Sequence, residues 1–410
     1  MSEQQTVHVH IGLGKTGTST IQRALAEQQQ ALREFGIHMP GGSHVDTRRA
    51  VYDLMGRRIG GGDSETVTGA WKPFARSVVA STAPTVVFSE EMLALARPRV
   101  VRRLVESLAP RRVIVIVTVR DLGRVLGSYW QQMVMMGRTE TLTEFLQAVR
   151  DPESGPASAG VGFWMRQDLI RTLNAWESAV PREDIRIVTL PAPGQAPDLL
   201  NDRFAEVIGA PAGLLRSSRR VGNASVGVPE AEVVRRLNEL LAHDLAENQR
   251  LSLMRIIREG LVGRESAPIT VPASEFDWIA ERSAAMVTEL SDRGYPVIGS
   301  LDDLTPRPGP ATALPGSGGE SDDAEVADAA IAALAAVSLD RARLWDRNRQ
   351  RAARRRRRRG GRGPSASPDK LASQGRALSF RMRTWALAKA DNSRVFGWAA
   401  RAYLKQTSRR

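Results

Sequence analysis

The chain has 410 residues, 42% hydrophobic and 25% charged, and a formal net charge of +13. This composition is typical of a globular protein with one large α/β domain and an additional region. The absence of cysteine excludes disulfides and thiolate metal sites. Residues 1–6 are polar, and no apolar run approaches the roughly 20 residues of a membrane span, so we expect a cytoplasmic protein without a secretory signal.

The positive charge is concentrated towards the C-terminal end. Residues 1–305 carry 35 Lys and Arg against 36 Asp and Glu, whereas residues 306–410 carry 23 against 9. The first part is therefore nearly neutral. The net charge gives no argument that this part binds nucleic acid.

A strand, a glycine-rich loop and a helix are predicted near the N-terminus. Val7–Ile11 alternates and is β-branched, which predicts a short buried strand. Residues 12–19 contain glycines, hydroxyls and Lys15, and Thr20–Leu32 has apolar residues at helical spacing. Glycines let a ligand approach the backbone, and the first N–H groups of the helix face it. This order of elements predicts an anion-binding cradle.

The loop differs from the Walker P-loop, which requires a glycine five residues before the Gly-Lys pair. Counting back from Gly14-Lys15, that position is Val9, inside the strand. An ATPase or kinase loop is therefore the weaker interpretation. A glycine turn with surface hydroxyls is the alternative without a ligand.

Strands and helices alternate along the rest of the main domain. We expect further strands at 84–89, 113–119 and 185–190, and helices at 45–55, 67–81, 100–108, 122–136, 142–149, 163–180, 199–208, 230–243 and 273–292, with a loop at 153–162. The apolar run VIVIVTV at 113–119 fits a central strand covered on both faces. This pattern predicts a three-layer α/β fold, with a mostly parallel central sheet flanked by helices and ligands at the carboxyl ends of the strands.

The C-terminal region is predicted to be separate. We place the main domain at 1–300, a flexible linker rich in Pro, Gly and Ser at 301–323, and a basic extension, part helical and part disordered, at 324–410. The extension contains an alanine-rich helix, six consecutive arginines and a basic segment with aromatic residues. Such a segment suits an anionic membrane surface or a polyanion, which would make the protein peripheral at the inner face of the membrane. A tail with nonspecific contacts is the alternative.

Arg120 follows the VIVIVTV strand directly, and Ser128 lies eight residues later in the next helix. Together with Lys15-Thr16-Gly17-Thr18-Ser19 after the first strand, these positions resemble the PAPS-dependent sulfotransferases. In that family the first string binds the 5′-phosphosulfate of PAPS, and the arginine and serine bind its 3′-phosphate. A guanidinium suits this role because it donates two parallel hydrogen bonds to phosphate.

A third string, Arg219-Arg220-Val221-Gly222-Asn223-Ala224-Ser225-Val226-Gly227, resembles the late basic loop that closes over the nucleotide in this family. The Asn-Ala-Ser-x-Gly-x-Pro-Glu pattern that starts at Asn223 resembles the bacterial carbohydrate type in particular. Arg219 or Arg220 would contact the 3′-phosphate. A helix N-terminus capped by Asn223 or Ser225 explains the same string without a ligand. The resemblance covers residues 7–299 and does not include the basic extension.

The resemblance implies a P-loop NTPase-like fold and transfer of a sulfuryl group from PAPS to a hydroxyl or amine, with a carbohydrate or glycolipid as the expected acceptor. It implies no metal and no specific nucleic acid. Lys15 would be catalytic. The residues expected to bind PAPS are Gly14, Lys15, Thr16, Gly17, Thr18, Ser19, Arg120, Ser128, Arg219, Arg220 and Gly222.

An acceptor hydroxyl needs a general base, which is His or Glu in this family. His44 follows the Pro-Gly turn after the first helix, and Glu91 follows the second long strand, with Glu90 as its neighbour. The sequence leaves these three residues as alternatives. His8 and His10 lie within the first strand, where we expect them to be packed.

Two other classes of function remain open. One is a P-loop-type kinase acting on a small molecule. The other is a noncatalytic protein that binds a membrane or polyanion through its basic extension. The identity of the acceptor and the oligomeric state are not encoded in any motif that we recognise.

Overall fold

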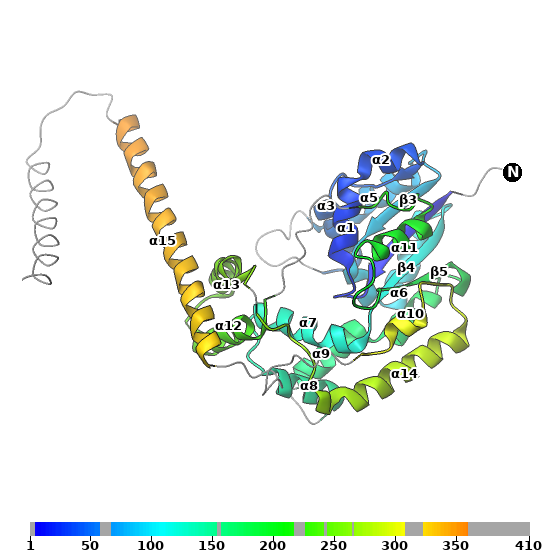
Figure 1. The fold of residues 1–410 in the computed structure, drawn as a ribbon. Coiled ribbons are helices and arrows are strands. Elements are labelled where there is room, and N and C mark those ends of the chain that lie inside the picture. The colour runs from blue at the N-terminus through cyan, green and yellow to red at the C-terminus, as the bar shows by residue number, and fades with distance from the viewer. Residues whose placement is uncertain are drawn as a thin grey trace, which may run out of the picture. The chain divides into compact units, whose positions relative to one another are not determined.

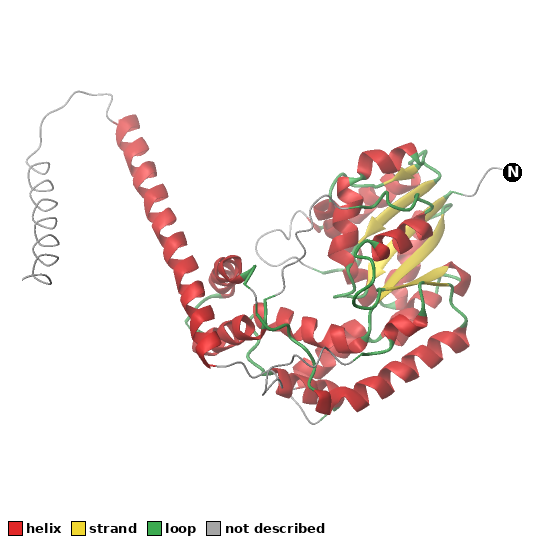
Figure 2. Ribbon diagram, in the orientation of Figure 1, coloured by secondary structure: helices red, strands yellow, loops and turns green. Residues whose placement is uncertain are grey.

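The computed structural model describes residues 5–57, 67–153, 157–216, 226–241, 244–264, 266–307 and 323–359 (Figures 1 and 2). Within these ranges, six parallel strands form a sheet in the order β2-β3-β1-β4-β5-β6. The strands are β1 (Thr6–Gly12), β2 (Ile37–His38), β3 (Thr85–Ser89), β4 (Arg112–Val119), β5 (Ile185–Thr189) and β6 (Val297–Ile298). The predicted α/β class with a parallel sheet flanked by helices is confirmed, and β6 is an addition that the sequence did not indicate.

The first strand lies in the middle of the sheet. Val9 pairs with Phe88 of β3 on one side and with Val115 of β4 on the other. Both β1 and β4 are almost entirely buried, as their apolar runs predict. Their carboxyl ends lie side by side, which brings the loop after β1 next to the residues that follow β4.

Helices cover both faces of the sheet. On one face, β1 packs through Val7, Val9 and Ile11 into a large apolar core. The helices of this face are α3 (His44–Leu54), α5 (Trp71–Val79), α6 (Pro98–Leu108), α10 (Leu169–Glu177) and α14 (Phe276–Arg293). The opposite face is covered by α1 (Thr18–Glu27), α2 (Gln29–Glu34) and α11 (Leu199–Ile208).

A second apolar core lies outside the sheet and consists of helices. Its members are α7 (Leu122–Met135), α8 (Leu142–Arg150), α9 (Ala157–Gln167), α12 (Val228–Leu240), α13 (Glu247–Leu261) and the first turns of α15 (Asp323–Arg359). Val326, Ala329 and Ala333 of α15 are buried in it. The sequence did not predict α13, and α15 continues through the arginine run, beyond the alanine-rich stretch.

The polypeptide divides into two compact units, Met1–Asp340 and Arg341–Arg410. The first unit contains both cores. A short 3₁₀ helix, Leu301–Leu304, adds Leu304 to the core below the sheet. In the second unit the described residues are the remainder of α15, where Arg349 lies over the ring of Trp345 at 5.4 Å. The predicted domain limits stay a prediction, and most of the predicted linker lies outside the described residues.

The predicted loop at 153–162 is wrong, because α9 already begins at Ala157. The glycines and serines of this segment suggested an irregular loop, but Gly160 allows α9 to pack closely against α8. A Cβ atom on Gly160 would lie 1.9 Å from the carbonyl oxygen of Ala148 in α8. Glycine is therefore required by the close approach of α8 and α9 and does not mark a loop.

Two long predicted helices are each divided in the structure. The helix expected at 163–180 breaks at Asp168, whose carboxylate accepts a hydrogen bond from the backbone N–H of Arg171 and caps α10. The helix expected at 20–32 breaks at Gln28, between α1 and α2. In both cases the apolar spacing continues across the break, so periodicity alone does not reveal it.

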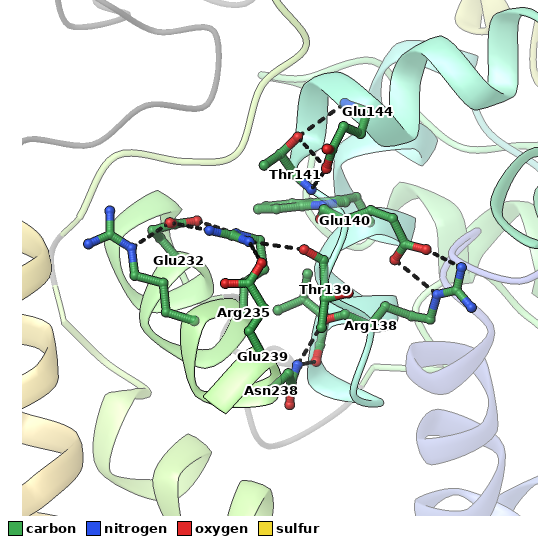
Figure 3. A network of polar contacts seen from close by, with 12 residues as sticks. Arg138, Thr139, Glu140, Thr141, Glu144, Glu232, Arg235, Asn238 and Glu239 are labelled. Carbon is green, nitrogen blue, oxygen red and sulfur yellow. Dashed lines mark hydrogen bonds and ion pairs between the residues drawn. The ribbon is translucent and has the colours of Figure 1, made fainter. Parts of the chain in front are cut away.

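A polar network joins α12 to the turn between α7 and α8 (Figure 3). Arg235 donates to the carbonyl of Thr139 at 3.0 Å and pairs with Glu232 at 2.7 Å. Asn238, one turn later, donates to the carbonyls of Val134 and Arg138 at 2.7 and 2.9 Å. These bonds hold α12 against the carboxyl-terminal end of α7.

The structure also bears on membrane insertion. Among the described helices, none combines the length and the apolar character needed to cross a bilayer.

Candidate functional site

A cavity of 940 Å³ lies where β1 and β4 end. It brings together seven residues that the sequence singled out: Lys15, Gly17, Thr18, Ser19, Glu91, Arg120 and Ser128. The loop after β1 and the turn after β4 supply most of them. This arrangement follows from the sheet, because the carboxyl ends of neighbouring parallel strands form one edge.

The loop between β1 and α1 has an unusual backbone. Gly12, Lys15 and Gly17 have φ angles of 79°, 64° and 82°. The positive φ at Gly17 favours glycine, and a Cβ atom there would also lie 2.4 Å from Leu200 Cδ2, so that this side chain would have to move. Lys15 is the non-glycine residue with a positive φ among those described, a conformation that costs about 1–3 kcal/mol and is concentrated at functional sites.

The amino end of α1 faces the cavity through Thr18, Ser19 and Thr20. Its N-cap residue is Gly17, which provides no side-chain cap, and no acidic residue lies in the first turn. No side chain of this helix therefore competes with an anion for the first N–H groups, although the N–H of Thr20 donates to the carbonyl of Gly17 at 2.9 Å. The partial positive charge of the helix end favours a bound phosphate or sulfate.

Two hydroxyls of the loop are engaged by the protein itself. Thr16 donates to the carbonyl of Leu13 at 2.5 Å, and Thr18 donates to the same carbonyl at 3.2 Å. Thr16 is fully buried and does not line the 940 Å³ cavity. Ser19 is exposed, so the donors that face the cavity are its hydroxyl, the ammonium of Lys15 and the backbone.

The second part of the site follows β4. Arg120 donates from Nη1 to the carbonyl of Lys15 at 3.3 Å, while its buried Nε has no partner in the structure. Burial, followed by the neighbouring charge of Arg124, lowers the pKa of Arg120 to about 10. The guanidinium is therefore a desolvated cation placed next to the loop.

Arg124 and Ser128 lie on successive turns of α7. Arg124 pairs with Asp121, the N-cap residue of this helix, and donates to the carbonyl of Pro191 at 3.1 Å. The Ser128 hydroxyl donates to the carbonyl of Arg124 at 2.9 Å, and Ser128 is one of the residues that line the cavity. A ligand in the cavity therefore meets Arg120, Arg124 and Ser128 on one side.

Burial lowers the pKa of Lys15, and the cations Arg120 and Arg258 lower it further, against the opposite effect of Glu91. Glu91 in turn has a raised pKa because it is buried, an effect that Arg48 and Lys15 partly offset. A lysine with a lowered pKa beside a glutamate with a raised pKa, both in one cavity, is typical of functional sites.

The three candidate bases occupy different places. Glu91 lines the cavity with Lys15, and a Cβ atom on Gly12 would lie 3.2 Å from its own Cβ. Glu90 is 1% exposed and faces α3, where Arg48 Nε lies at 3.5 Å and His44 Nε2 at 3.8 Å. His44 is not among the residues that line the cavity. Burial and then Arg48 lower its pKa.

The wall opposite the loop comes from α13, a helix that was not predicted from the sequence. Leu251, Met254, Arg255 and Arg258 of this helix line the cavity. The spacing of Met254, Ile257 and Leu261, all buried, was the available signal. With Arg255 and Arg258, the described residues that line the cavity include five cationic residues and one acid, which favours a polyanionic ligand.

A smaller cavity of 410 Å³ lies behind the loop and shares Arg120 with the first. Thr16 lines this second cavity, and Gln167 on its wall donates to the carbonyl of Gly14 at 2.9 Å. The carbonyl of Gly14 therefore helps to fix the loop to α9 on the side away from the 940 Å³ cavity.

Arg219, Arg220 and Gly222 lie outside the described residues, so their predicted contact with the nucleotide stays a prediction. In the part of the chain that the structure describes, no group of three or more His, Asp or Glu side chains is arranged to hold a metal ion. No protein-family model, curated protein or solved structure matches the chain.

Proposed function

We propose that the protein is a PAPS-dependent sulfotransferase that transfers a sulfuryl group to a hydroxyl or amine of an acceptor, with a carbohydrate or glycolipid as the expected acceptor class. One observation carries this proposal. A single cavity contains an anion-binding loop with Lys15 and the amino end of α1, and beside it Arg120 and Ser128. Two anion-binding groups in one cavity suit a nucleotide with phosphate groups at both the 5′ and 3′ positions.

The strand order supports the same interpretation. The chain leaves β1 towards β2 on one side and leaves β4 towards β5 on the other, so the crevice between β1 and β4 is a topological switch point. Nucleotides bind at such points in open α/β sheets. A P-loop NTPase-like fold is part of this proposal.

In the proposed reaction, the acceptor oxygen forms a bond to sulfur while the bond from sulfur to the bridging phosphate oxygen breaks. Lys15 stabilises the charge that develops on the leaving phosphate, and Ser19 and the loop N–H groups orient the phosphosulfate. Arg120 and Ser128 hold the 3′-phosphate, which fixes the nucleotide for in-line attack. The products are the sulfated acceptor and PAP (adenosine 3′,5′-bisphosphate).

Glu91 is our choice for the base that takes the acceptor proton. It lines the cavity together with Lys15, and its raised pKa makes its carboxylate a better proton acceptor than an ordinary glutamate. His44 and Glu90 form a pair beside it that positions Arg48.

The basic extension is proposed to bring the enzyme to an anionic membrane surface or another polyanion. The structure suggests where to truncate it. Val326, Ala329 and Ala333 are buried in the second core, so a deletion that starts before α15 would also expose that core. Removing 341–410 leaves the compact unit Met1–Asp340 intact.

The test is calorimetric titration of the protein with PAP and, separately, with ATP and Mg²⁺. We expect tight PAP binding that Lys15→Ala and Arg120→Ala both weaken strongly, whereas Lys72→Ala, an exposed lysine of α5, leaves it unchanged. Absence of PAP binding, or a clear preference for ATP, would contradict the proposal and favour the kinase. Transfer activity that survives removal of 341–410 would separate catalysis from the extension.

A further inference from the structure

Beneath the loop, five buried or partly buried polar side chains form a continuous hydrogen-bonded chain. His10 Nδ1 lies 2.8 Å from Ser89 Oγ, and His10 Nε2 lies 3.0 Å from Thr118 Oγ1. Thr118 Oγ1 lies 2.7 Å from Thr16 Oγ1, and Gln22 Nε2 lies 3.2 Å from Ser89 Oγ. This series of hydrogen bonds therefore leads from α1 through β3, β1 and β4 to the loop.

The direction of every bond in this chain is determined by donor capacity. Thr16 donates its hydroxyl hydrogen to the carbonyl of Leu13, which can only accept, so Thr118 must donate to Thr16. The hydroxyl hydrogen of Thr118 is then used, and His10 must donate to it from Nε2. A neutral imidazole has one N–H group, so Nδ1 accepts from Ser89.

We propose that His10, as its Nε2–H tautomer, is a positioning residue that holds the anion-binding loop in its ligand-ready conformation through Thr118 and Thr16. This inference rests on the proposed role of the loop. Thr118 holds the loop twice, through the hydroxyl bond to Thr16 and through its carbonyl, which accepts from the Leu13 N–H at 2.9 Å. Lys15, the residue with the strained positive φ, lies between Leu13 and Thr16 in the sequence. The two hydrogen bonds from Thr118 to Leu13 and Thr16 therefore restrict the backbone on both sides of Lys15.

His8 provides an internal comparison. It points from the same strand, is 5% exposed, and its buried Nδ1 has no partner in the structure. His10 is fully buried and both of its ring nitrogens are bonded. Burial lowers the pKa of both rings, to about 4 for His8 and about 3 for His10. Both are neutral at pH 7, but only His10 connects to the loop through the bonds described above.

The first experiment needs no ligand. Nitrogen-15 NMR of the histidine rings in the full-length protein should show His10 neutral, with its proton on Nε2, from pH 5 to pH 8. A proton on Nδ1, or titration of this ring near pH 6.5, would overturn the proposal.

The second experiment separates positioning from stability. We expect Thr118→Val to weaken PAP binding roughly tenfold, since one hydrogen bond that supports the loop is lost, and Thr118→Ser to restore it to within about twofold. His8→Gln should leave PAP affinity unchanged, although it also alters a buried histidine. Melting temperatures are measured for each variant. A lower melting temperature of Thr118→Val with unchanged PAP affinity would overturn the proposal, because it would show a purely structural role.

Inorganic pyrophosphate is the second probe and separates this inference from the proposed function. If wild-type protein binds pyrophosphate but not PAP, the sulfotransferase proposal fails while the positioning role is still tested by the Thr118 variants. If pyrophosphate binding is equal in wild type, Thr118→Val and Thr118→Ser, the positioning role is contradicted whatever PAP does.

Discussion

The two walls of the 940 Å³ cavity are built in different ways. On the strand side, hydrogen bonds to neighbouring strands and to the backbone hold the loop and Arg120 in place, through Thr16, Thr118 and the carbonyl of Lys15. On the α13 side, Arg255 and Arg258 are exposed, and the helix is held by apolar contacts. A Cβ atom on Gly260 would lie 2.3 Å from the Cβ of Ala336 in α15, which shows how closely these helices pack.

The two walls are expected to contribute differently to the free energy of ligand binding. Polar groups that are buried and fixed bind a ligand without much loss of side-chain entropy, and their charges are little screened by water. Exposed arginines lose side-chain entropy when they bind a ligand, and water and salt screen their charges. We therefore expect the strand side to supply most of the binding and catalytic free energy, and the α13 side to supply a smaller, salt-dependent part.

The largest effect is expected at Lys15. Lys15→Ala should lower the transfer rate about 100- to 1,000-fold, because the loop loses the cation proposed to stabilise the charge that develops on the leaving group. Rates measured with saturating PAPS and acceptor check this. A variant with less than about fivefold loss would show that the strand side does not stabilise the transition state.

The second prediction concerns the pH dependence of the free energy of unfolding, which the two histidines of β1 on the strand side should produce. The pKa values of His8 and His10 in the folded protein, about 4 and about 3, lie below the ordinary value of 6.5. The unfolded chain therefore binds more protons below pH 6.5, and stability is lost as pH falls through this range. At pH 5 the loss should be about 2 kcal/mol for each histidine, measured by urea unfolding.

His8→Gln and His10→Gln provide the matched variants for this measurement. Each should remove its own part of the pH dependence between 6.5 and 5. Glu90 and Glu91, whose pKa values are raised by burial, act in the opposite direction, so the test is the difference between each variant and the wild type. The same change in unfolding free energy between pH 6.5 and 5 in the wild type and in both variants would contradict the buried neutral state of both rings.

The third prediction concerns the attachment of α12 to the turn after α7. Arg235→Ala should lower the free energy of unfolding by roughly 1–3 kcal/mol, because the carbonyl of Thr139 loses its donor and Glu232 loses one of its two arginines (Figure 3). Arg236→Ala is the control, since Arg236 pairs with the same Glu232 but is half exposed. Its effect should stay within about 0.5 kcal/mol. Equal effects of the two variants would contradict a role for the Thr139 bond.

The smallest effect is expected on the α13 side. Arg258→Gln should weaken PAP binding about two- to fivefold at low salt and have almost no effect at high salt, because this exposed cation acts on the cavity through solvent. Arg255→Gln should have a smaller effect, since Arg255 pairs with Glu259 at 4.0 Å, whereas Arg258 is one of the cations that lower the pKa of Lys15. An effect of Arg258→Gln as large as that of Lys15→Ala would remove the distinction between the two walls.

The main features of the strand side could be predicted from local sequence. An apolar alternating run gives β1, an unbroken apolar run gives β4, and parallel strands align their carboxyl ends. The resemblance to sulfotransferases implied one site for Lys15, Arg120 and Ser128, and these residues line one cavity. Their roles towards PAPS stay predictions.

The sequence alone could not predict which way each side chain points. Thr16 was expected among the ligand donors, but its hydroxyl lies beneath the loop and bonds to Thr118, more than a hundred residues away in the sequence. His10 was expected to be packed, which is confirmed, yet its link to the loop depends on two strands that flank β1. Such contacts arise from strand order and register, which local patterns do not specify.

The amino-acid sequence by itself determined the α/β class, the parallel sheet and the loop at the end of β1, because periodicity and glycine placement act over a few residues. Only the tertiary structure decided that α13 forms the opposite wall and that Glu91, unlike His44, lines the cavity. It also decided that Gly160 belongs to a helix. The physical reason is that these features depend on which distant surfaces pack together, and packing is a property of the whole chain.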